Sequence, residues 1–137
     1  AKVDPDGFAI VVATVDGQVY AVGDADRRFS IQSVSKPFVY GVALEDVGRD
    51  RVEQAIGMEP TGDAFNSISL EPGTGRPLNP MINAGAIAAS SLVAGASEAG
   101  RLQRVLDALS TYAGRELDIV GGEAGRHGPL LMQAVRS

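Results

Sequence analysis

The sequence predicts an α+β fold in which an antiparallel sheet packs with helices, within a single domain of 137 residues. Two runs rich in β-branched residues, 8–15 and 18–22, flank the turn signal Asp16-Gly17, which indicates a β-hairpin. The later runs 36–47 and 101–113 have the length and apolar spacing of helices. A hydrophobic content of 45% is enough for these elements to share a folded core.

The first predicted helix, 36–47, should lie at the centre of the fold. Its apolar residues occur on nearly every side, which is typical of a buried helix. Gly48 ends it, and Pro37 is tolerated because an amide in the first turn has no intrahelical partner. Between this helix and the hairpin, residues 23–26 predict another turn.

The second half of the chain alternates loop and helix. Glycine and proline punctuate residues 57–80, which predicts a long loop of the kind that is often functional. Small residues over 83–94 predict a helix that other backbones approach closely. The amphipathic run 101–113 predicts a helix that ends at Gly114, and 129–135 predicts a short last helix.

Composition argues against several classes of function. The net charge is −5 without a basic run, so we expect no nucleic-acid partner. Without cysteine there is no thiolate chemistry or cysteine-ligated metal, which fits a cytoplasmic location. No stretch approaches the ~20 apolar residues of a membrane span, so we expect no membrane partner. The acidic residues are scattered and indicate a solvated surface, not a metal site.

The chemistry of the chain is expected at Ser33-Val34-Ser35-Lys36. Three residues of separation place Ser33 and Lys36 on one face of a helix, one turn apart. A serine hydroxyl needs a base to become a nucleophile, and a lysine amine is that base when an apolar pocket favours its neutral form. The apolar residues expected to form the pocket are Phe29, Ile31, Val34, Pro37, Phe38 and Val39. The alternative is a serine N-cap followed by a solvated lysine.

Three further segments accompany this motif: Gly57-Met58-Glu59-Pro60-Thr61-Gly62, Phe65-Asn66-Ser67 and Asn79-Pro80-Met81-Ile82-Asn83-Ala84-Gly85-Ala86-Ile87. The Asn83 carboxamide both donates and accepts hydrogen bonds, which suits an amino-acid ligand, although a helix N-cap is its commoner use. Asn66 receives no catalytic role, and Gln32 would orient the loop before Ser33. His127 has no carboxylate placed to pair with it, so no Ser-His-Asp triad is readable.

In this order the four segments resemble the serine-dependent glutaminases, which are similar in fold to β-lactamases and DD-peptidases (penicillin-binding proteins). The likeness runs over residues 8–117. It implies that Ser33 attacks the side-chain amide of L-glutamine, forms a glutamyl ester and releases ammonia, after which water yields glutamate. It also implies that Lys36 deprotonates Ser33 and that Asn83 binds the substrate. We expect no cofactor, and a homo-oligomer.

The resemblance weakens after residue 117, where the family has Ser-Glu followed by Arg-Asn. Here residues 118–129 contain Glu123, which we assign as the substrate-binding glutamate, although no Arg-Asn follows. The family also has a tyrosine upstream, and further tyrosines, an oxyanion-hole amide and strands downstream. We therefore expect the chain to lack the N-terminal and C-terminal parts of the family domain.

Two other functions stay open at this point. A catalytically impaired homologue would use the pocket to bind a ligand or partner; the altered region around Glu123 favours it, and retention of Ser33 and Lys36 argues against it. A penicillin-interacting enzyme would share Ser-x-x-Lys, but its Ser-Asp-Asn and Lys-Thr-Gly tripeptides are absent.

Overall fold

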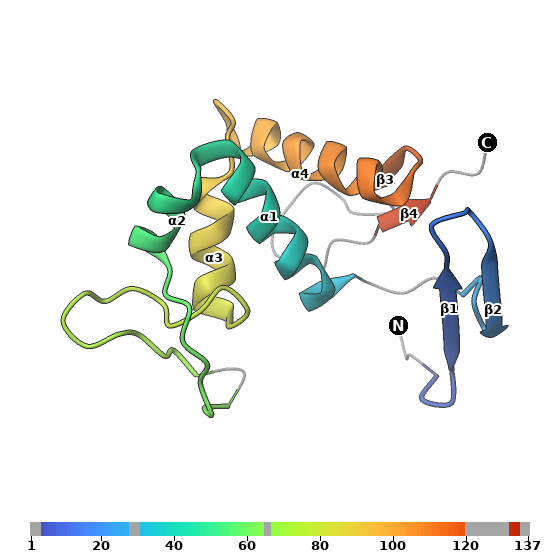
Figure 1. The fold of residues 1–137 in the computed structure, drawn as a ribbon, viewed down its shortest axis with the longest axis horizontal. Helices are drawn as coiled ribbons and strands as arrows, with labels where there is room; N and C mark the ends of the chain where they lie inside the picture. The colour runs from blue at the N-terminus through green and yellow to red at the C-terminus, as the bar shows by residue number, and fades with distance from the viewer. Residues whose placement is uncertain (1–3, 28–30, 65–66, 120–131, 135–137) are drawn as a thin grey trace.

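A computed structural model of the chain describes residues 4–27, 31–64, 67–119 and 132–134. Figure 1 shows a β-hairpin at one end of the molecule and a group of packed helices beside it. The α+β prediction is therefore confirmed. In chain order the elements are β1 (Ala9–Ala13), β2 (Val19–Gly23), the 3₁₀ helix η1 (Gln32–Ser35), α1 (Lys36–Val47), α2 (Arg49–Ala55), α3 (Asn83–Leu92), α4 (Glu98–Ala113), β3 (Leu117–Ile119) and β4 (Met132–Ala134).

The hairpin forms where the sequence predicts it. Strands β1 and β2 pair antiparallel, with Ala9 opposite Gly23 and Ala13 opposite Val19. The Thr14 amide donates to the Gln18 carbonyl at 2.9 Å, and Gly17 takes a φ of +86°, a conformation that costs glycine little. Both faces of the hairpin are open. Its large apolar side chains are each more than half exposed: Phe8, Ile10, Val11, Val12, Val19, Tyr20 and Val22.

Helix α1 is the centre of the helical part, as its apolar surface predicts. It packs against α2, α3 and α4, and Val42 and Ala43 on it are buried. One buried cluster joins Ala43 to Val52, Ile56 and Ala89, and a second joins Val42 to Val93 and Ala108. Figure 1 shows α1 lying alongside α3. None of the helices in the described part of the chain is long and apolar enough to cross a membrane.

The C-terminal ends of α1 and α4 lie where the sequence predicts them. The start of α4 and the end of α3 differ from the prediction by a few residues. Gly48, at a φ of +79°, ends α1, and Gly114, in the left-handed conformation, ends α4. Helix α4 begins at Glu98, ahead of the predicted residue 101, because the Ser97 hydroxyl accepts the Gly100 amide at 3.1 Å. Helix α3 ends at Leu92, slightly before the predicted residue 94.

The structure adds one helix that was not predicted and corrects one predicted helix. Helix α2 has no predicted counterpart, because most of its residues are polar and only Val52 is buried. The helix predicted over 129–135 is wrong where the chain is described, since β4 pairs antiparallel with β3 and places Met132 opposite Ile119. A short apolar run does not distinguish a helix from a strand, and the pairing partner decides.

The Asp46 carboxylate links α1 to α4 and to the residues that follow α3. Its Oδ2 accepts the Ala94 amide at 2.8 Å, just beyond α3, and its Oδ1 accepts Arg104 Nε of α4 at 3.0 Å. The Asp46 side chain is only 8% exposed, whereas that of the neighbouring Glu45, which also pairs with Arg104, is 61% exposed. The buried carboxylate is thus the stronger link, because solvent screens the exposed one.

We predict that Asp46→Ala lowers the free energy of unfolding by about 1–3 kcal/mol, since two donors lose a charged acceptor. Glu45→Ala is the matched control on the adjacent, exposed position and should cost less than about 1 kcal/mol. Urea denaturation followed by circular dichroism measures both. An equal or larger loss for Glu45→Ala would contradict the role given to Asp46.

Candidate active site

Ser33 lies in η1, the single 3₁₀ turn that leads into α1. The Ser35 hydroxyl donates to the Gln32 carbonyl at 2.7 Å and closes this turn. In a 3₁₀ helix the residues i and i+3 lie above one another, so η1 brings Ser33 and Lys36 to the same side. Ser33 is exposed at the surface, and Gln32 before it has a φ of +38°, a left-handed conformation that is uncommon for a side-chain-bearing residue.

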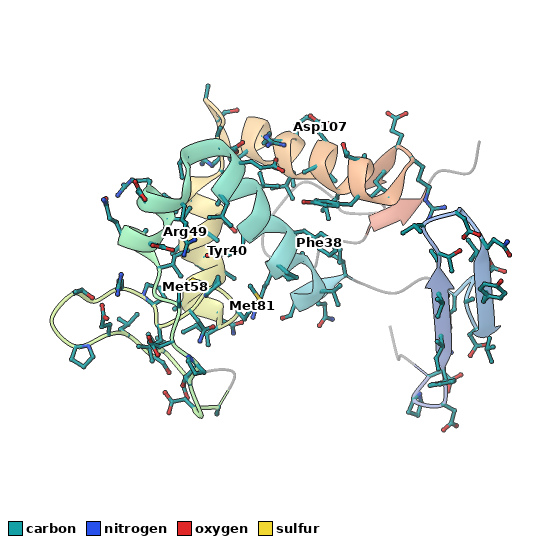
Figure 2. All side chains as sticks on the ribbon, viewed as in Figure 1. Phe38, Tyr40, Arg49, Met58, Met81 and Asp107 are labelled. Atoms are coloured by element: carbon teal, nitrogen blue, oxygen red, sulfur yellow. The ribbon has the colours of Figure 1, made fainter. Side chains whose placement is uncertain are left out.

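The Lys36 amine joins this turn to the start of α3. Its Nζ donates to the Met81 carbonyl at 2.9 Å and to Asn83 Oδ1 at 2.8 Å, across 45 and 47 residues of sequence. Figure 2 shows Met81 between the first turns of α1 and α3. Two of the motifs found in the sequence therefore meet at one half-buried amine.

Asn83 is not the N-cap that its position suggests. It is the first residue of α3, the N-cap is Ile82, and the N-cap residue makes no side-chain capping bond. The carboxamide oxygen faces Lys36 instead. Among the described residues the Asn83 Nδ2 group makes no hydrogen bond, which leaves a donor beside the lysine for a ligand.

None of the described residues of the expected apolar pocket is fully buried. Val34 is 57% exposed, Pro37 is also exposed, and the Phe38 ring packs against Tyr112 with centroids 5.3 Å apart. The two hydrogen bonds that the Lys36 amine makes to described residues go to oxygen atoms. Within the described residues no hydrogen bond joins Lys36 to Ser33, so that contact stays a prediction.

Asn79 also belongs to this site, although no role was predicted for it from the sequence. Its Oδ1 accepts the amides of Met81 at 3.0 Å and Ile82 at 3.2 Å, and its Nδ2 donates to the Glu59 carbonyl at 3.0 Å. The sequence does carry a signal for it: an asparagine that precedes a proline shortly before a helix start is well placed to bind the free amides there.

The loop between α2 and α3 is ordered by its own charged side chains. The Ser69 hydroxyl, which is buried, donates to Asp63 Oδ2, and this bond holds the pKa of the Asp63 carboxyl below its usual value. The Arg76 guanidinium beside Glu71 lowers the pKa of that carboxyl, and Arg76 Nη1 also donates to the Glu53 carbonyl of α2 at 2.6 Å. These contacts anchor the loop that carries Glu59.

The described part of the chain does not include Phe29, Asn66, Glu123 or His127, each of which is considered in the sequence. The part that is described contains no group of three acidic or histidine side chains suited to hold a metal ion. What it does contain is a serine hydroxyl, a lysine amine and a carboxamide from two segments, and this set of groups fits nucleophilic acyl chemistry.

Comparisons with known proteins point to one family. A family model described as Glutaminase matches residues 1–121. A glutaminase of Trichormus variabilis is 57% identical over 117 residues, which are 85% of this chain and 35% of that protein. Glutaminase 2 of Bradyrhizobium diazoefficiens is 52% identical over 118 residues, 86% of this chain and 19% of that protein. The chain spans at most about a third of the length of these relatives.

Solved structures agree with the sequence relatives. The crystal structure of Mglu in its glutamate form superposes with a TM-score of 0.78 at 48% identity, covering 87% of this chain and 28% of that one. A probable glutaminase of Bacillus subtilis gives a TM-score of 0.77 at 36% identity, covering 82% of this chain and 36% of that one.

The start of α3 is packed so closely that we predict opposite effects for two helical glycines. A Cβ on Gly85 would overlap the carbonyl oxygen of Asn79, so Gly85→Ala should destabilise the chain by about 1–3 kcal/mol. Gly41 in α1 is the control: its nearest neighbour would be the Tyr112 hydroxyl at 3.7 Å, so Gly41→Ala should stabilise by about 0.5–1 kcal/mol. Denaturation midpoints measure both, and a stabilising Gly85→Ala would show that α3 does not start against Asn79.

Proposed function

The chain belongs to the glutaminase family, and we propose that the protein containing it hydrolyses L-glutamine to L-glutamate and ammonia through an ester on Ser33. The observation that supports this proposal is that the Met81 carbonyl and Asn83 Oδ1 hold the amine of Lys36, a residue that follows Ser33 by one 3₁₀ turn. Since the chain spans about a third of its relatives, the remaining parts of the site belong to other segments of the protein.

The two acceptors suit a lysine that acts as a base. A neutral amine has two N–H donors and one lone pair. The Met81 carbonyl and Asn83 Oδ1 take up the two donors, which leaves the lone pair for the hydroxyl proton of Ser33. An amine held in this way is oriented for proton transfer.

The reaction then follows in balanced steps. Lys36 takes the hydroxyl proton as Ser33 Oγ bonds to the carboxamide carbon of glutamine, and the resulting ammonium returns the proton to the leaving nitrogen as the C–N bond breaks. Water hydrolyses the glutamyl ester, with the same amine accepting and returning a proton. Asn83 binds the substrate through its Nδ2 group, and Glu123 is a second binding residue.

The proposal also covers the substrate, the location and the oligomeric state of the complete protein. L-Glutamine is the small-molecule partner, and the complete protein is a cytoplasmic homo-oligomer. Support for the substrate comes from the relatives, which carry the name glutaminase, and from the Mglu crystal structure in its glutamate form.

We predict that Ser33→Ala abolishes glutamine hydrolysis in the complete protein and leaves it folded. Loss of the hydroxyl removes the covalent route, while an exposed residue of one 3₁₀ turn contributes little to stability. Ammonia release and circular dichroism are the two measurements. Ser90→Ala, which removes an exposed hydroxyl that bonds to the Ala86 carbonyl within α3, is the control and should keep most of the activity. Turnover by Ser33→Ala close to that of the wild type would refute the assigned nucleophile.

The 137-residue chain assayed alone should be a much weaker enzyme than the complete protein. A missing oxyanion donor by itself costs about 10²–10³ in rate. We therefore expect kcat/KM for ammonia release to fall by at least about 10²-fold, with the loss visible in kcat as well as in KM. Equal kcat/KM for the two chains would show that residues 1–137 already hold a complete site.

A further inference from the structure

The Asn79 side chain is held at both ends of its amide group. Its Nδ2 is tied to the Glu59 carbonyl, and its Oδ1 bridges the amides of Met81 and Ile82. A carboxamide used as donor and acceptor at once has one fixed orientation. The loop that carries Glu59 therefore sets where this oxygen lies.

One peptide group connects Asn79 to the lysine. The Ile82 amide and the Met81 carbonyl belong to the same planar unit, with the N–H and C=O pointing in opposite directions. Asn79 Oδ1 accepts the N–H side at 3.2 Å, and Lys36 Nζ donates to the C=O side at 2.9 Å. Because the unit is rigid, holding one side fixes the direction of the other.

We propose that Asn79 is a positioning residue for the base, which fixes the Met81–Ile82 peptide so that the Met81 carbonyl holds the Lys36 amine toward Ser33. This inference rests on the proposed function. Asn79 does not touch the amine itself; it acts through the peptide plane, and hydrogen bonds in such a chain polarise one another. The position of the Asn83 carboxamide follows from the same anchor, since Asn83 is the residue directly after Ile82.

The alternative explanation is that Asn79 only stabilises the contact between its loop and the start of α3. Ser69→Ala is the control that separates the two. Ser69 is a buried residue of the same loop, and its hydroxyl donates to Asp63, whereas the Lys36 amine is held by Met81 and Asn83. A variant at Ser69 therefore removes the bond to Asp63, while the Glu59 amide keeps its own bond to the Leu78 carbonyl at 3.0 Å and the lysine hydrogen bonds stay in place.

The experiment compares Asn79→Ala, Asn79→Asp and Ser69→Ala in the complete protein, with L-glutamine as substrate. We expect Asn79→Ala to lower kcat by about 10²-fold, the cost of a misplaced catalytic group, with KM changed by less than about threefold. Asn79→Asp keeps an oxygen that accepts both amides and should recover kcat at least about tenfold over Asn79→Ala. Ser69→Ala should lower the denaturation midpoint and keep kcat.

Crystal structures of the wild type and of the Asn79 variants provide a readout that does not need turnover. We expect the distance from Lys36 Nζ to the Met81 carbonyl oxygen to exceed about 3.5 Å in Asn79→Ala and to stay within hydrogen-bond length in Asn79→Asp. Should Asn79→Ala not fold, Asn79→Asp carries the test. If Lys36 no longer reaches the Met81 carbonyl in Asn79→Asp and kcat is nevertheless unchanged, the inference is refuted.

The same measurements distinguish this inference from the proposed function. A wild-type protein that does not release ammonia from glutamine would overturn the proposed function, and the crystal structures would still decide whether Asn79 sets the position of the lysine amine. With an active wild type, the inference is overturned if Asn79→Ala keeps its kcat, or if Ser69→Ala loses as much kcat as Asn79→Ala.

Discussion

Lys36 reaches the Met81 carbonyl and the Asn83 carboxamide only because α1 and α3 pack at very short range. The two helices meet through alanines that are almost fully buried, Ala43 on α1 and Ala89 on α3. Gly85 allows a second close approach, between the first turn of α3 and the Asn79 backbone, where any side chain would overlap that backbone. Larger residues at Ala43 or Ala89 would push the two helices apart, and a side chain at Gly85 would displace the segment that carries Asn79, so the small residues favour this arrangement of the site.

The hairpin and the helices differ in what holds them together. The helical group has two buried clusters and an ion pair that links α1 to α4. The hairpin has its own backbone ladder and an open apolar surface on both faces. A two-stranded hairpin is marginally stable by itself, and exposed strand edges and apolar patches are surfaces that proteins normally cover. Ser33 lies in the turn between these two parts, next to the well-packed one.

The environment of the lysine bears on the base role proposed for it. Burial among apolar side chains favours the neutral form of an amine, whereas hydrogen bonding to fixed acceptors orients it. In this chain the acceptors are a backbone carbonyl and a carboxamide oxygen, both at the start of α3. Orientation is then the main contribution of the protein, because the two acceptors define the direction of the remaining lone pair. Such a site depends on the groups behind the acceptors, and Asn79 is the first of them.

Several features of this chain can be predicted from local signals in the sequence. The Asp16-Gly17 turn specified the hairpin, the apolar run before Gly48 specified α1, and the spacing of Ser33 and Lys36 placed them on one turn. Two other features emerge only from the packed fold: Asn83 faces the lysine instead of capping α3, and residues 132–134 pair as a strand. These features depend on contacts between distant segments, and such contacts leave no periodic pattern in the chain because they form only when helices and strands have packed.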